Sequence, residues 1–200
     1  MACGPRPPVR LIACGALARE ILALGRLNGG VPFDLVCLPA NLHNRPEQIP
    51  WSVRAKIRQA RADGFDKIFV LYADCGTGGE LDQVLAEEGV ERLAGPHCYA
   101  TFMGQAAFLD HAEAEPGCFY LTDYLARQFD HLVIEGLGID RHPELLPLYF
   151  GNYDKLVYLA QTRDPAILAK AEAAAARLGL DFEHRWTGYG ELADVLRQVA

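Results

Sequence analysis

The sequence predicts an α/β fold, with a three-layer, mainly parallel, Rossmann-like sheet and helices on both faces. Short apolar runs alternate along the chain with amphipathic segments of helical length, which is typical of parallel strands joined by crossover helices. Half of the 200 residues are hydrophobic, enough to bury a sizeable core. Because no linker or low-complexity tract interrupts the pattern, we expect a single domain over residues 1–200, with a frayed tail at residues 1–8.

The first half of the chain predicts strands that each end in a turn. The apolar run "VRLIAC" is a buried strand, and the helix after it is closed by glycine. Pro50 starts the second helix, since proline is favoured in the first helical turn. The strands are expected at 9–14, 33–39, 66–73 and 90–95, and the helices at 15–29, 50–64 and 78–89.

The second half continues the alternation. Pro165 lies in the first turn of a strong helix, and the run "KLVYLA" before it is a buried strand. The strand "LDFEHRWT" and its flanking helices are expected to complete the sheet, because those helices would cover its apolar surface. The strands are expected at 118–122, 155–160 and 180–187, and the helices at 100–117, 123–138, 164–179 and 190–200.

The composition argues against several classes of function. The formal net charge is −7 and the basic residues are scattered, so the chain has no basic footprint for nucleic acid. No apolar run approaches the roughly 20 residues that span a bilayer, and the N-terminus "MACGPRPP" lacks the apolar core of a signal peptide. We therefore expect a cytoplasmic protein. Its six cysteines then indicate metal binding or thiol chemistry rather than a disulfide framework.

Three of the cysteines follow directly on predicted strands. Cys14, Cys75 and Cys98 come after the first, third and fourth strands, and the carboxyl ends of parallel strands meet at one edge of a sheet. Converging thiolates bind soft metals or iron–sulfur clusters, because the metal offsets their mutual repulsion. We predict that these sulfur atoms lie within roughly 4 to 7 Å of one another. The remaining cysteines are expected elsewhere: Cys3, Cys37 and Cys118.

Glycines and helix starts surround these cysteines. Gly15 and Gly76 allow the backbone to approach a bound group closely. The N-termini of the following helices supply partial positive charge, which stabilises thiolates or an anionic cluster. Thr77, Gly78 and Gly79 are interpreted as a nest of backbone amides for an anion. We therefore predict cofactor contacts for four of these residues: Gly15, Gly76, Thr77 and Gly78.

Two histidines and an aspartate are candidates for acid–base chemistry or for a fourth ligand. His97 adjoins Cys98, and His43 follows the second strand, so both can reach the same sheet edge. Asp74 is a candidate partner that orients a histidine or a bound water. Each has an ordinary alternative, namely a loop histidine bonded to the backbone or an aspartate that caps a helix. For a single cysteine the ordinary alternative is a small buried residue.

Several motifs together resemble a known family. The segments "LIACGALAREI", "LPANLHNRPEQIP", "LYADCGTGGELD", "GPHCYATFMG", "FYLTDYLARQFD" and "DRHPELLPLYFGNYDKLVYLAQT" occur in the family's order between about residue 9 and about residue 190. They are similar to the bacterial and archaeal proteins grouped as the domain of unknown function DUF1638. The resemblance implies a cytosolic α/β protein, often associated with corrinoid-dependent methyltransferase systems. It also sets apart the residues that stand in these motifs: Cys14, Cys75, Cys98, His43 and His97.

These observations leave several functions open. The first is an iron–sulfur protein, with a 4Fe–4S cluster held by the three cysteines and one iron open to a substrate or a fourth ligand. The second is a zinc site of three thiolates, whose open fourth position activates a thiol or water and suits methyl transfer. The others are a module that binds a small ligand without metal, and an enzyme with Cys75 or Cys98 as nucleophile beside a histidine. The expected partner is a small-molecule substrate, or a corrinoid or methyltransferase protein.

Overall fold

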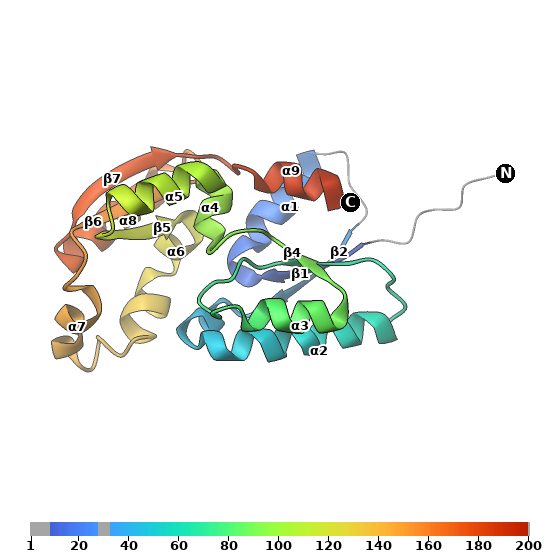
Figure 1. Cartoon of the computed structure of the whole chain (residues 1–200). Helices are drawn as coiled ribbons and strands as arrows, with labels where there is room; N and C mark the ends of the chain where they lie inside the picture. Colours follow the sequence, from blue (N-terminus) through green and yellow to red (C-terminus); the bar gives the residue numbers. More distant parts are fainter. Residues whose placement is uncertain (1–8, 28–32, 200) are drawn as a thin grey trace. The chain divides into compact units, whose positions relative to one another are not determined.

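The computed structural model describes residues 9–27 and 33–199 of the chain. It shows two parallel sheets with helices packed on them, so the predicted α/β class is confirmed (Figure 1). The chain divides into two compact units, Met1–Cys98 with Leu192–Ala200, and Tyr99–Glu191. Each unit has a sheet of its own, where the sequence led us to expect one sheet in one domain. The tail expected at residues 1–8 lies outside the described residues.

The first unit is built on a parallel sheet with the strand order β2-β1-β3-β4. The central strand β1 pairs with β2 on one side and β3 on the other, and Cys14 at the end of β1 is in register with Leu38 at the end of β2. The edge strand β4 is two residues long, which leaves little backbone for a further strand to pair with. The strands are β1 Val9–Cys14, β2 Phe33–Leu38, β3 Ile68–Leu71 and β4 Glu91–Arg92.

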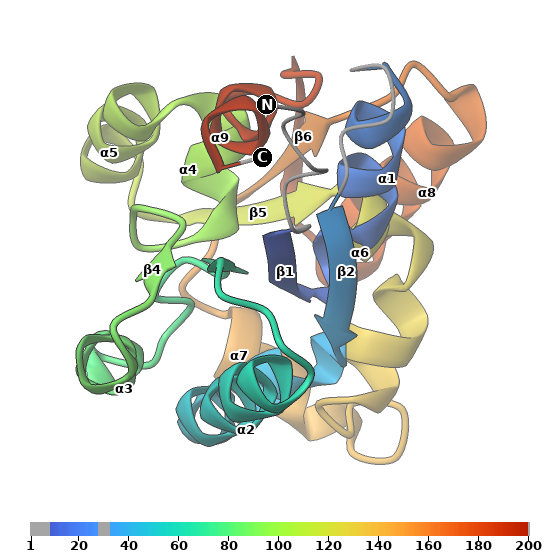
Figure 2. The same ribbon diagram turned by 90° about the vertical axis from the view of Figure 1, so that its right-hand side faces the viewer.

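Helices cover both faces of this first sheet, as β1 requires, since all of its side chains are buried. Two helices pack on one face, where Ile12 and Val70 of the sheet meet Val53 and Leu81 of the helices in one apolar cluster. Figure 2 shows these helices, α2 and α3, side by side and α1 on the other side of the strands. The helices are α1 Ala18–Leu27, α2 Ile49–Ala62, α3 Glu80–Glu88 and α9 Leu192–Val199.

The second unit repeats the layered arrangement with the strand order β5-β6-β7. One face of its sheet packs on α8 through Tyr158 and Ala171, and the other packs on α4 and α5 through Tyr120 and Phe108. Figure 2 shows α5 and α8 on opposite sides of the strands. The strands are β5 Cys118–Thr122, β6 Lys155–Ala160 and β7 Asp181–Trp186, so the predicted C-terminal strand forms the edge of this sheet.

Two of the helices expected in the second unit are broken into shorter pieces, whereas α8 has the expected length. The helix predicted at 100–117 is interrupted at Gly104, whose φ of 93° starts a new helix. The helix predicted at 123–138 ends at Arg127 and is followed by a π-helical turn, Asp130–Glu135. The helices are α4 Cys98–Met103, α5 Gln105–Ala114, α6 Asp123–Arg127, α7 Leu146–Phe150 and α8 Pro165–Leu178. Among the described residues, no helix has the length and apolarity to cross a membrane.

Candidate metal centre

The first part of the candidate site is the turn after β1, where Cys14 meets His43. Cys14 is 2% exposed, and its Sγ accepts a hydrogen bond from the amide of Ala16 over 3.4 Å. The same Sγ lies 3.8 Å from Nδ1 of His43, and this Nδ1 lies 3.0 Å from the carbonyl oxygen of Ala40. In the neutral ring Nδ1 therefore carries the hydrogen that the carbonyl accepts. Nε2 keeps the lone pair, which is the state in which histidine binds metals.

Tyr72 packs against His43 just beyond the end of β3. The two rings are stacked, with centroids 6.1 Å apart and planes 14° from parallel. The tyrosine is 1% exposed, and its hydroxyl makes no hydrogen bond of good geometry within the described part of the chain, although the Cys14 thiol lies close enough to affect it. Burial and the nearby Cys14 thiol raise the pKa of Tyr72. An unpaired buried hydroxyl costs about 1–3 kcal/mol, so a bound group that accepts this hydrogen would stabilise the site.

The second part of the site is the turn after β3, where Cys75 has a left-handed backbone. Its φ is 51°, and it is the one non-glycine residue with positive φ in the part of the chain that the structure describes. The amide of Asp74 donates to the carbonyl oxygen of Gly95 over 3.1 Å, and the amide of Cys75 donates to that of Pro96 over 2.8 Å. These two bonds tie the turn after β3 to the loop that precedes Cys98.

The thiols of Cys75 and Cys98 influence each other's pKa as a result. The neighbouring Cys98 thiol lowers the pKa of Cys75 most, and His43 and His97 lower it further, to well below its usual value despite burial. The Cys75 thiol and burial raise the pKa of Cys98. Burial lowers the pKa of His43, but hydrogen bonds to Cys14 and Cys75 outweigh it and raise the pKa to about 11. His43 is therefore a charged donor between two thiols in the metal-free site.

The structure thus brings most of the predicted site residues into one interacting group. His43 lies against the thiol of Cys14, and the Cys98 thiol and both candidate histidines lower the pKa of Cys75. Reasoning from the sequence missed Tyr72, although an aromatic residue at a strand end, two positions before an Asp–Cys pair, was a usable signal. The group consists of Cys14, His43, Tyr72, Cys75, His97 and Cys98.

Asp74 stabilises the turn around Cys75. Its Oδ1 accepts hydrogen bonds from Oγ1 of Thr77 over 2.7 Å and from the amide of Gly79 over 2.9 Å, and its Oδ2 accepts one from the amide of Gly78 over 3.2 Å. Burial raises the pKa of Asp74, but these bonds lower it by more. The nest predicted for an external anion is therefore engaged by a carboxylate of the chain itself. The predicted cofactor contacts of Thr77 and Gly78 stay a prediction, with Asp74 as the competitor for the same donors.

Glycine is required at two positions beside the cysteines. A Cβ atom on Gly15 would lie 3.0 Å from the carbonyl oxygen of Leu38, closer than most real Cβ contacts. Gly15 therefore lets the turn after β1 pack against the end of β2. Gly76 has a φ of 85°, which residues with a side chain rarely adopt. Both glycines thus shape the turns that present Cys14 and Cys75.

The other cysteines differ in their relation to the site. Cys37 is exposed on β2, in register with Ala13, one position before the residue that pairs with Cys14. Burial and the Cys14 thiol raise the pKa of Cys37, so this cysteine borders the group rather than lying far from it. Cys118 starts β5 in the second unit, and Cys3 lies outside the described residues.

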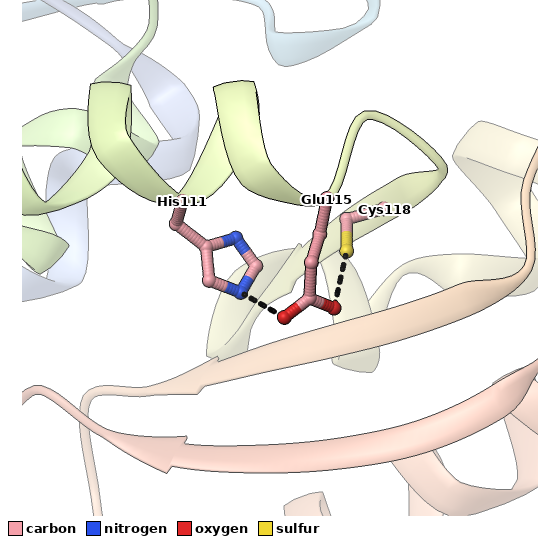
Figure 3. A group of neighbouring side chains, drawn as sticks. All are labelled: His111, Glu115 and Cys118. Carbon is pink, nitrogen blue, oxygen red and sulfur yellow. Dashed lines mark hydrogen bonds and ion pairs between the residues drawn. The ribbon is translucent and has the colours of Figure 1, made fainter.

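A second group of potential ligands lies in the second unit. His111, Glu115 and Cys118 each offer one ligand atom, and these atoms all lie within 4.8 Å of one another (Figure 3). The sequence interpretation gave none of the three a role. The signal was a histidine and a glutamate four positions apart on one helix face, followed three positions later by a cysteine.

Comparison with known proteins identifies a family. A family model described as "Protein of unknown function (DUF1638)" matches residues 37–196. The matched segment includes His43, Cys75, His97 and Cys98, whereas Cys14 precedes it. No curated protein and no solved structure matches the chain. Because the match covers more than half of the 200 residues, the chain belongs to the DUF1638 family.

Proposed function

We propose that this protein binds an iron–sulfur cluster through Cys14, Cys75 and Cys98. The proposal is supported by the position of His43 between Cys14 and Cys75, and by the mutual effect of Cys75 and Cys98 on each other's pKa. A set of three thiols with an adjacent imidazole suits a soft metal or a cluster. All described cysteines are free, which leaves these thiols available, and we place the protein in the reducing cytoplasm.

The spacing of the ligands supports a cluster over a single zinc ion. Ligands of one tetrahedral zinc lie about 3.8 Å apart, because each Zn–S bond is about 2.3 Å long. Among the described residues, the trio with all ligand atoms within 4.8 Å of one another is His111, Glu115 and Cys118, not the strand-end cysteines. A larger cluster accepts more widely spaced sulfurs, each of which binds its own iron.

The surrounding residues have defined tasks in this proposal. A bound cluster would supply a redox centre or a Lewis-acidic iron. The hydroxyl of Tyr72, buried without a partner, is positioned to donate to an anionic group at the site. His43 either takes the fourth ligand position or donates to a sulfur, with Ala40 fixing its ring. The turn after β3, held by Asp74, keeps Cys75 oriented inward.

The family resemblance supplies the biological setting that we propose. Corrinoid-dependent methyl transfer requires partners that handle electrons or methyl groups, and an open iron or a zinc-bound thiol could serve either need. The partner would then be a small-molecule substrate, or a corrinoid or methyltransferase protein. Zinc bound by the same three cysteines remains the alternative metal.

The test is cluster reconstitution under anaerobic conditions. Wild-type protein should become brown, with about four iron and four sulfide per chain for a 4Fe–4S cluster. Cys14→Ser, Cys75→Ser and Cys98→Ser should each lose most of the iron and the visible absorption. Cys37→Ser is the matched control, since Cys37 borders Cys14 but is exposed, and it should keep both. A colourless wild type, or a cluster retained in all three variants, would contradict the proposal.

Nucleophilic thiol chemistry is a second candidate because the pKa of Cys75 is lowered by the Cys98 thiol and both histidines. A thiolate beside an imidazole is the usual arrangement of a cysteine nucleophile. Alkylation of metal-free protein distinguishes the two functions. A nucleophile should react fastest at Cys75, whereas exposed Cys37 should react first if the thiols form a buried ligand set.

A further inference from the structure

His111 is a buried histidine with one nitrogen unsatisfied. It is on α5, its side chain is 7% exposed, and its Nδ1 lies 2.8 Å from the hydroxyl of Tyr120. Its Nε2 has no hydrogen-bond partner in the described part of the chain. When Nδ1–H donates to the tyrosine oxygen, Nε2 presents a lone pair to whatever lies in front of it. This is the orientation that an outer hydrogen bond gives to metal-binding histidines.

Two further ligand types lie in front of that nitrogen (Figure 3). Glu115 directly follows the last residue of α5, four positions after His111, with Oε1 3.7 Å from Nε2 of His111. Cys118 starts β5, is 7% exposed, and has its Sγ 3.8 Å from Oε2 of Glu115. Nitrogen, oxygen and sulfur ligands thus converge from a helix and a strand of the same unit. All three ligand atoms lie within 4.8 Å of one another.

We propose that His111, Glu115 and Cys118 form a zinc site, separate from the strand-end cysteines. Zinc accepts a nitrogen, a carboxylate oxygen and a thiolate together, and three protein ligands leave a fourth position for water or a substrate. The charges fit, because a thiolate and a carboxylate balance the charge of Zn²⁺. The glutamate side chain is 41% exposed, which gives the ion an entrance while the other two ligands stay buried.

Lys155 is the group that a metal ion must displace. Its ammonium donates to Oε2 of Glu115 and also, over 3.2 Å, to Oε2 of Glu183 on β7. Zinc at the site would compete with Lys155 for Glu115, while Glu183 keeps the lysine paired. Lys155 therefore sets the metal affinity of the site without being a ligand.

The experiment measures zinc binding by the full-length chain, stripped with a chelator, kept reduced and titrated against a chromophoric chelator. Cys75→Ser is the background, so that the strand-end site does not contribute. In that background His111→Gln and Cys118→Ser should each raise the Kd for zinc by more than about 100-fold. This exceeds the usual effect of removing a residue that only hydrogen-bonds to a metal ligand. His131→Gln is the matched control. His131 faces Glu135 over 3.2 Å at the same spacing, but its side chain is 71% exposed, so its loss should leave Kd unchanged.

Two further measurements separate a metal site from a merely structural cluster. Lys155→Met should tighten zinc binding about tenfold, because it removes the competitor for Glu115. In the unmutated chain, zinc should slow alkylation of Cys118 at least about tenfold, since metal-bound thiolate is shielded, while Cys37 reacts at an unchanged rate. No zinc binding in the Cys75→Ser background, or a Cys118 that zinc does not protect, would overturn the proposal. Neither result bears on the strand-end cysteines, whose test is the reconstituted cluster.

Discussion

The amide of Cys75 donates to the carbonyl oxygen of Pro96 over 2.8 Å, and this bond joins the turns that follow β3 and β4. It holds the loop that precedes Cys98 against the turn that contains Cys75. It also fixes Cys75 in a conformation that a side chain disfavours, with a φ of 51°. The chain therefore accepts local backbone strain at a cysteine that it directs inward, as is frequent at functional sites.

The strain at Cys75 predicts different stabilities for two variants that both lack the thiol. Cys75→Gly should be more stable than Cys75→Ala by about 1 kcal/mol, because glycine has no Cβ atom and adopts a positive φ without strain. Urea unfolding of the metal-free variants measures the difference. Both should lose metal equally, so metal analysis separates the thiol from the backbone. Equal stabilities would mean that the left-handed conformation is not strained.

Tyr72→Phe should have opposite effects on the fold and on the metal. The metal-free variant should be more stable by about 1 kcal/mol, since it no longer buries an unpaired hydroxyl. Its affinity for the bound metal group should fall about tenfold or more, because an outer hydrogen bond is lost. Thermal unfolding without metal and metal retention under chelator challenge measure the two effects. A loss of stability in the metal-free variant would show that the hydroxyl is already paired.

The charged pair of His43 and Cys75 predicts a plateau in the stability of the metal-free protein. The folded pKa of His43 is raised from 6.5 to about 11, and that of Cys75 is lowered from 9.0. Between about pH 6.5 and 9 the folded pair and the unfolded pair each hold one proton, so stability changes little. Above about 9 the unfolded chain has lost that proton, so stability falls as pH rises toward 11. Below about pH 6.5 the unfolded pair binds one proton more than the folded pair, so stability falls as the pH is lowered.

Replacement of the histidine tests this pH profile. His43→Gln should make the alkaline decrease shallower but not abolish it, because the raised pKa of His43 is one cause of the decrease and the raised pKa of Cys98 is another. Urea midpoints measured from about pH 5 to 10.5 in wild type and variant give the comparison. A wild-type profile that keeps rising above pH 9 would contradict the assignment of the charged pair.

Asp123 should be essential for the stability of the second unit. Its carboxylate is fully buried and accepts hydrogen bonds from the Tyr158 hydroxyl over 2.7 Å and from the amides of Gln161 and Thr162 over 3.0 Å. Asp123→Asn places an NH₂ group against these donors and should cost about 3 kcal/mol or more. The control is Asp130→Asn, which breaks a surface pair with Arg177 and should cost less than about 1 kcal/mol. Similar urea midpoints for the two variants would contradict the prediction that Asp123 contributes much more to stability than Asp130.

The alternation of apolar strands and helices was enough to predict the α/β class, and it was enough to place Cys14 at the end of β1 and Cys75 in the turn after β3. Both depend on local sequence and on the general geometry of parallel sheets. The break into two sheets was not predictable in this way. The first sheet ends at β4, and a two-residue strand cannot be told from a longer one in "VERLAG".

Details of the site depended on contacts between distant segments. The left-handed conformation of Cys75 follows from its bond to Pro96, and no local pattern encodes it. The unpaired Tyr72 hydroxyl is a property of packing, since the same residue on a surface would bond to water. The four-residue spacing of His111 and Glu115 was visible in the sequence. Whether they could bind a metal together depended on Cys118, which reaches the same point from β5.

The ligands proposed for the cluster come from turns at positions 14, 75 and 98, with no closely spaced pair among them. An unfolded or partly synthesised chain therefore offers no closely spaced pair of these three cysteines that could capture a cluster early. Metal would enter after the turns have been assembled, and the newly made protein would first exist as a folded, metal-free form. The full binding free energy would then stabilise the folded state, by about 2.7 kcal/mol at a free metal concentration one hundred times Kd. In a cell short of iron, such a protein would accumulate folded and empty, ready to be loaded.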